Sequence, residues 1–134
     1  MPLSGINMKI IRFDSLKFIP ASHDDPLSPG ALKKILLSRG DIPNGRVQMI
    51  NWAKMGVGKS FQPHYHEDMA EVFIILTGKA QIQINKEIED LYKGDVVIIP
   101  EKQTHLMKNI AETELEYIAL GITTGDGTGK TVNV

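Results

Sequence analysis

Chain-breaking residues are spread evenly along this sequence, and the apolar runs between them are short. Prolines and glycines recur from Pro20 to Gly125 and leave no long uninterrupted segment. A globular helix needs roughly ten or more residues free of such breaks, whereas a strand needs only about four to eight. The spacing therefore predicts an all-β chain made of many short strands and no long helix.

Several runs between these breaks have the composition of strands. They are rich in β-branched or aromatic residues, and residues 81–84 alternate strictly between polar and apolar, as a half-buried strand does. Residues 31–37 fit either a helix or a sheet edge, and we favour the strand. The five clearest runs are residues 47–52, 72–76, 80–84, 95–99 and 115–122.

Length and charge indicate one domain without a charge bias. The 134 residues carry a net charge of -1, which implies neither a nucleic-acid nor a membrane partner. The sequence shows no signal-like apolar run, so we expect a cytoplasmic protein. Residues 1–134 should form a single domain, with an N-terminal strand and irregular arm over about 1–30, a barrel over about 45–122, and a mobile tail over about 123–134.

Three of the four histidines are part of a pattern whose spacing suits metal binding. His64 and His66 are two residues apart, so on a strand both side chains point to the same face. Glu71 follows nearby and His105 comes later. The chain has no cysteine, which excludes thiolate metal sites and disulfides. The remaining chemistry is that of imidazole and carboxylate ligands on β structure.

A short segment resembles a phosphate-binding loop, so nucleotide binding has to be considered as an alternative function. Gly58, Lys59 and Ser60 satisfy a permissive version of that motif. A phosphate loop needs a helix immediately after it, and Pro63 stands where the helix interior would lie. We therefore expect no nucleotide cofactor.

The histidine pattern extends into two longer motifs that resemble those of the cupin superfamily. Each motif places glycines at turns and ligands at fixed spacings, and a short segment separates the two motifs. The resemblance implies a single-domain cupin, which is a jelly-roll-type double-stranded β-barrel, and its pairing as a homodimer. The first motif consists of Gly58, His64, His66, Glu71 and Gly78, and the second of Gly94, Pro100, His105 and Asn109.

One position departs from the second motif. Lys102 stands where the family pattern has a glycine. A non-glycine residue in a left-handed conformation costs roughly 1 to 2 kcal/mol, so the turn before His105 either carries that strain or adopts another type. We also consider that Lys102 overhangs the barrel mouth and attracts anionic ligands.

The resemblance implies that His64, His66, Glu71 and His105 bind one divalent transition metal ion. Four protein ligands around a six-coordinate ion leave two open positions, which favours Fe, Mn, Co or Ni over Zn. Strand alternation places four further side chains near this site. They are Gln62, Phe73, Ile75 and Met107, although barrel core is the favoured interpretation for the last three.

Three functions are consistent with such a site and a small-molecule ligand. The first is a metal-dependent enzyme of oxygenase or decarboxylase type that acts on a small oxygenated metabolite. The second is a sugar or sugar-phosphate isomerase or epimerase. The third is a non-catalytic small-molecule binding module. The ligand set favours an enzyme, and the first class leads.

Overall fold

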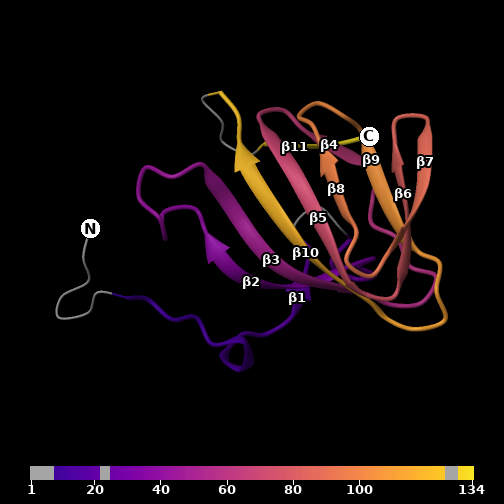
Figure 1. The fold of residues 1–134 in the computed structure, drawn as a ribbon, viewed down its shortest axis with the longest axis horizontal. Coiled ribbons are helices and arrows are strands. Elements are labelled where there is room, and N and C mark those ends of the chain that lie inside the picture. Colours follow the sequence, from indigo (N-terminus) through magenta and orange to yellow (C-terminus); the bar gives the residue numbers. More distant parts are fainter. Residues whose placement is uncertain (1–7, 22–24, 126–129) are drawn as a thin grey trace.

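The computed structural model describes residues 8–21, 25–125 and 130–134, and nearly all of its regular structure is β (Figure 1). A short 3-10 helix, Phe13–Ser15, precedes the strands. No helix in the described part of the chain is long and apolar enough to cross a membrane. The strands are β1 Ile19–Pro20, β2 Leu32–Ser38, β3 Val47–Met55, β4 His64–His66, β5 Met69–Thr77, β6 Lys79–Ile84, β7 Glu87–Tyr92, β8 Val96–Ile99, β9 His105–Asn109, β10 Leu115–Thr123 and β11 Thr131–Asn133.

These strands form two antiparallel sheets that enclose the core between them. One sheet has six strands in the order β1-β2-β3-β10-β5-β8, and the other has five in the order β11-β4-β9-β6-β7. Strands far apart in sequence are neighbours in both sheets, as β3 and β10 are. This is the jelly-roll-type barrel, and it confirms the predicted all-β fold class.

Alternation of side chains decides which residues enter the core. Along β5 and β10 every second residue is buried, and the residues between them are partly exposed. Phe73, Ile75, Tyr117 and Ala119 therefore face inward and pack with Met107 of the opposite sheet. The barrel interior is a packed apolar core through most of its length.

The five clearest predicted runs overlap β3, β5, β6, β8 and β10, whereas β7 is not among the predicted runs. Residues 31–37, which we favoured as a strand, overlap β2. Because β2 joins the larger sheet, that sheet begins before residue 45. The tail expected at 123–134 contains β11, which pairs with β4. Residues 131–133 are therefore part of the five-stranded sheet, while residues 126–129 lie outside the described residues.

Two motif glycines stand where the chain passes from one sheet to the other. Gly78 joins β5 to β6 and Gly94 joins β7 to β8, with φ of 90° and 88°. Such positive φ values strain most L-residues but not glycine. A Cβ atom on Gly78 would also lie 3.2 Å from the Glu114 carbonyl oxygen. These glycines let short connections turn between the sheets.

Lys102 keeps the left-handed conformation that the motif glycine would adopt. Its φ is 64°, and its backbone N–H donates a 2.7 Å hydrogen bond to the His66 carbonyl. The side chain is exposed beside Tyr65, Glu67 and Asp68, in a surface hollow separate from the main cavity. The structure therefore gives no support for an anion-attracting lysine at the mouth of that cavity, because two carboxylates lie beside it.

Lys102→Gly should stabilise the protein by about 0.5 to 1 kcal/mol. It relieves the left-handed strain of roughly 1 to 2 kcal/mol but adds backbone freedom to the unfolded chain. Urea unfolding measures the difference. Lys93→Gly is a matched control, because Lys93 is a turn lysine without positive φ and the same change there should only destabilise. Equal effects at the two positions would contradict this account of the turn.

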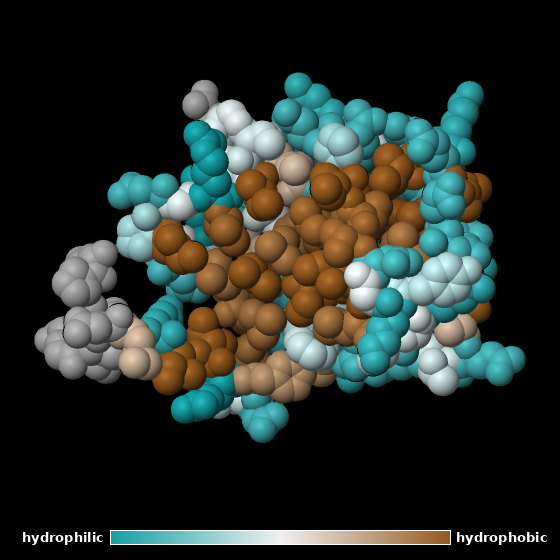
Figure 2. Space-filling view, in the orientation of Figure 1, coloured by the Kyte–Doolittle hydropathy of each residue, from teal (hydrophilic) through white to brown (hydrophobic). Residues whose placement is uncertain are grey.

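The outer face of the six-stranded sheet is apolar and partly uncovered (Figure 2). One row of side chains crosses five strands at matched register positions. Ile98 and Val96 on β8 are 67% and 54% exposed. Single exposed apolar residues are ordinary, but a continuous apolar face is typical of a binding surface. The row consists of Ile98, Val72, Leu120, Ile50 and Leu37.

Candidate metal centre

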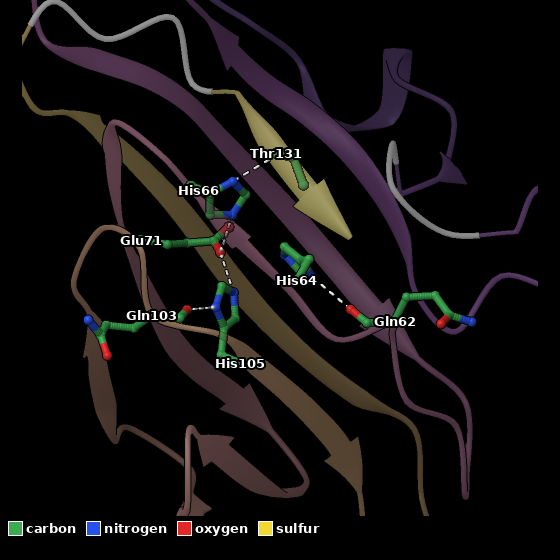
Figure 3. Close-up of polar contacts among 7 residues, drawn as sticks. All are labelled: Gln62, His64, His66, Glu71, Gln103, His105 and Thr131. Atoms are coloured by element: carbon green, nitrogen blue, oxygen red, sulfur yellow. Dashed lines mark hydrogen bonds and ion pairs between the residues drawn. The ribbon is translucent and has the colours of Figure 1, made fainter. Parts of the chain in front are cut away.

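Four predicted ligands, His64, His66, Glu71 and His105, meet between the two sheets. His64 and His66 come from β4, His105 from β9 beside it, and Glu71 from β5 of the facing sheet (Figure 3). One potential ligand atom from each lies within 4.8 Å of all the others. His64 and His105 are direct cross-strand partners, with ring centroids 4.4 Å apart. The short strand β4 thus places two imidazoles inward at once.

All four side chains are buried, with relative exposures between 1% and 5%. An ionised carboxylate is unstable in such a place unless positive charge or hydrogen bonds compensate it. Glu71 Oε1 lies 3.1 Å from Nε2 of His66 and 3.1 Å from Nε2 of His105. Burial alone would raise the pKa of the Glu71 carboxyl, but the contacts with His105 and His66 hold it well below its usual range. The site therefore keeps a negative charge inside the barrel.

The second nitrogen of each imidazole is held by a specific oxygen. Nδ1 of His64 lies 2.7 Å from the Gln62 carbonyl, and Nδ1 of His105 lies 2.9 Å from the Gln103 carbonyl. A carbonyl only accepts hydrogen bonds, so both Nδ1 atoms must carry the proton. The lone pair of each neutral ring is then on Nε2, the nitrogen that faces the cluster.

This tautomer makes the contact between His105 and Glu71 chemically informative. A neutral His105 protonated on Nδ1 would aim its Nε2 lone pair at a carboxylate oxygen, and the two would repel. A cation between them, either a proton or a metal ion, removes that repulsion. Three inward Nε2 atoms and one carboxylate are donors that suit first-row divalent transition metals. The residues present thus fit a bound metal ion.

His66 depends on the C-terminal strand for its orientation. Its Nδ1 lies 3.0 Å from the hydroxyl oxygen of Thr131, which belongs to β11 (Figure 3). Outer partners of this kind fix the ring and set its basicity towards a metal. The sequence pattern gave no signal for Thr131, because it lies in a segment predicted to be a mobile tail.

A cavity of about 320 Å³ opens onto this cluster. Three of the four clustered residues, His64, His66 and Glu71, line it. Ala53 and Ala119 leave room, since they occupy inward positions of β3 and β10 with small side chains. The cavity lining combines apolar side chains with nearly as many polar ones, and such a mixture suits a small polar ligand.

The four expected pocket residues have different positions. Phe73 lines the cavity. Ile75 and Met107 face inward as alternation predicts, but they are fully buried in the core and do not line it. Gln62 offers its backbone carbonyl to His64, while its side chain is exposed and points away from the cluster (Figure 3). Alternation gave the inward face for the three residues within strands but not for Gln62, which precedes β4, and it could not show at which level the packed core ends.

The cavity also contains residues that the sequence pattern did not single out. Tyr117 lines it, whereas Trp52 lies on the outer face and donates a hydrogen bond to Glu116. Phe61 packs its ring against His64 at a centroid distance of 5.2 Å. Lys33 and Asn51, from β2 and β3, also line the cavity. In the sequence, nothing distinguishes Lys33 and Asn51 from other residues of these strands.

Known proteins resemble this chain in both sequence and fold. The sequence profile of the cupin domain family matches residues 51–121. An uncharacterised protein from Methanocaldococcus jannaschii is 30% identical over 113 residues, which are 84% of this chain and 86% of that one. An oxalate-binding protein from Thermotoga maritima is 28% identical over 85 residues, which are 63% of this chain and 69% of the relative.

Among solved structures, that of a predicted oxalate decarboxylase from Thermotoga maritima superposes with a TM-score of 0.76. The two are 24% identical, and the match covers 86% of this chain and 99% of the other. At that identity the likeness concerns the fold alone.

Proposed function

Because this chain belongs to the cupin family, we propose that it is a metal-dependent enzyme acting on a small oxygenated metabolite. The metal would be held by His64, His66, Glu71 and His105. The observation that carries this proposal is the cavity that opens onto three of these four buried side chains. A ligand in the cavity would contact the metal directly. The oxalate-binding relative supports a carboxylic acid as that ligand.

The leading reaction class is oxygenation or decarboxylation. A divalent Fe, Mn, Co or Ni ion held by these four residues would supply Lewis acidity to an oxygen-containing substrate in the cavity. Zn is disfavoured because its catalytic sites usually have three protein ligands.

The protein's own contribution is to keep the ionised Glu71 and the oriented imidazole rings in a buried site. Glu71 supplies the one negative charge of the ligand set, and the backbone carbonyls behind His64 and His105 keep both rings in one tautomer. Phe61 and Phe73 border the cavity and exclude water from that side. Electrostatic interactions with a bound acid are stronger in such surroundings than in water.

The test begins with protein purified without a histidine tag and without added metal. Elemental analysis gives the metal, and oxygen uptake and CO₂ release are then followed with oxalate and with small 2-oxo and 2-hydroxy acids. Turnover with the metal-loaded protein supports the proposal. Conversion of an aldose to a ketose without oxygen uptake would instead indicate an isomerase. A loaded protein that converts none of these compounds would contradict an enzymatic role and favour a binding module.

Thr131→Val should weaken metal binding by about 10- to 100-fold without unfolding the barrel. Valine keeps the shape of threonine but removes the hydroxyl that orients His66, and outer partners of metal ligands have effects of this size. Competition with a metal chelator measures the affinity. Thr131→Ser restores the hydroxyl and should bind nearly as wild type does. Equal affinities for the valine and serine variants would mean that Thr131 does not orient His66.

We also propose that a second copy of this chain covers the apolar outer face of the six-stranded sheet. The row from Ile98 to Leu37 is a continuous apolar face that is most exposed at Ile98, and such faces are typical of binding surfaces. Ile98→Lys should therefore shift the protein towards the monomer in light scattering. Ile88→Lys is the matched control, because Ile88 is 54% exposed on β7 of the other sheet. A wild type that is already monomeric at high concentration would contradict the dimer.

A further inference from the structure

Asn51 has a buried polar atom that lacks a hydrogen-bond partner in the described part of the chain, which is unusual in a folded protein. Its side chain is 7% exposed and lines the cavity, and its Oδ1 finds no hydrogen-bond partner among the described residues. A buried polar atom left in this state costs about 1 to 3 kcal/mol, so proteins rarely keep one without a reason. A ligand with a donor would satisfy Oδ1 as it stands, whereas a carboxylate, which only accepts, requires the amide N–H to face the ligand. The carboxamide can also turn over and offer its N–H instead.

Lys33 lies next to Asn51 on the same inner face. Lys33 pairs with Ala53, and Ile35 pairs with Asn51, so Lys33 and Asn51 are diagonal neighbours across β2 and β3. Such neighbours are about 7 to 8 Å apart, which allows both to contact one small group. The small side chain of Ala53 leaves space beside them. The lysine and the amide therefore form a polar corner of the cavity on β2 and β3, where Ser38 and Gln48 also line it.

The charge of the cavity indicates what this corner would bind. Within the described part of the chain, Lys33 supplies the one ammonium and Glu71 the one carboxylate among the lining residues. Burial lowers the pKa of the Lys33 ammonium, and the charge of Glu71 acts in the opposite direction. A divalent ion and Lys33 together outweigh Glu71, which leaves the loaded cavity with a net charge of +2 when the imidazoles are neutral. A dianion balances that charge.

We propose that Lys33 and Asn51 form a subsite for the second carboxylate of a small dicarboxylic acid, whose first carboxylate binds at the metal. This inference rests on the proposed function and names its class of substrate. Lys33 would make a charge-assisted hydrogen bond to the carboxylate, and Asn51 would donate from its amide. The subsite is on β2 and β3 while Glu71 is on β5, so the two carboxylates would contact different strands of the same sheet.

The cavity volume agrees with a ligand of this size. A water molecule occupies about 30 Å³ of liquid, so about 320 Å³ holds on the order of ten non-hydrogen atoms. A dicarboxylic acid of three to six carbons fits this limit.

The experiment is a calorimetric titration of the metal-loaded protein with succinate, and with butyrate as the matched monocarboxylate. Succinate should bind at least about tenfold more tightly than butyrate, because only succinate reaches the charged subsite. Lys33→Met should lower succinate affinity by about tenfold or more and leave butyrate affinity unchanged. Lys33→Arg keeps the charge and should restore most of the loss. Asn51→Leu should also weaken succinate binding, and Asn51→Asp should weaken it further through repulsion.

Controls separate this inference from the proposed function. Lys79→Met removes a lysine on β6 that lies outside the cavity, and it should bind succinate as wild type does. Metal content is measured on every sample. If the loaded wild type binds succinate and butyrate equally, or Lys33→Met matches wild type, the subsite is overturned while the metal site stands. If no ion binds at all, the proposed function fails. The same titration of metal-free protein then decides the subsite, since Lys33→Met must still weaken succinate binding.

Discussion

We expect that replacing both His64 and His66 by alanine abolishes metal binding by the cluster. The change removes two of the four clustered ligands, both from β4, and leaves Glu71 and His105 alone in the barrel. Losing a partner behind a ligand already weakens metal binding by about 10- to 100-fold, so losing two direct ligands must exceed that range. Elemental analysis after purification without added metal measures the effect.

The controls for this double variant test folding and position separately. Tyr65→Phe changes the residue between the two histidines, whose side chain points to the other face of β4, and it should retain full metal content. Glu71→Gln keeps the volume of the side chain but removes its charge, so it should bind metal weakly while circular dichroism shows an intact fold. Wild-type metal content in the double variant would refute the assignment of these ligands.

The candidate site was predictable because strand geometry acts over very short distances. Two residues apart on a strand always face the same way, so His64 and His66 had to point inward together once β4 formed. The contribution of His105 depends instead on pairing between β4 and β9, which the local sequence does not encode. It was reached through the resemblance of spacing to a known family, and the structure places its Cα opposite that of His64.

The parts that the sequence did not predict are those set by pairing with a neighbouring strand. β7 contains three acidic residues and has only one buried position, so it lacks the apolar pattern of a strand. It forms because β6 offers it an edge over six residues. β11 similarly forms against β4, in a segment of Thr, Gly and Lys that alone indicates a tail. Lys33 and Asn51 become candidate ligand-binding residues only in the structure, because both line the cavity.

The motif asparagine, Asn109, has a structural role. Among the proposed stability variants, its removal should have the largest effect. Its side chain is 1% exposed and makes three hydrogen bonds. Its Nδ2 donates to the Met55 carbonyl at 3.0 Å and to the Thr113 carbonyl at 2.9 Å, and its Oδ1 accepts from the Ala111 N–H at 2.9 Å. It thus closes the turn after β9 and ties that turn to β3.

Asn109→Leu should destabilise the protein by about 3 kcal/mol. Leucine has the same branched skeleton of side-chain heavy atoms, but it leaves two carbonyls and one N–H of the backbone without their partner, and each net hydrogen bond contributes roughly 1 kcal/mol. Urea unfolding of metal-free protein measures the loss without any contribution from metal binding. Thr113→Ala is the matched control, because the carbonyl that Asn109 uses stays in place and stability should change little. If Asn109→Leu proved as stable as wild type, the hydrogen bonds of this turn would contribute nothing net, and a role at the metal site would become the better explanation for this asparagine.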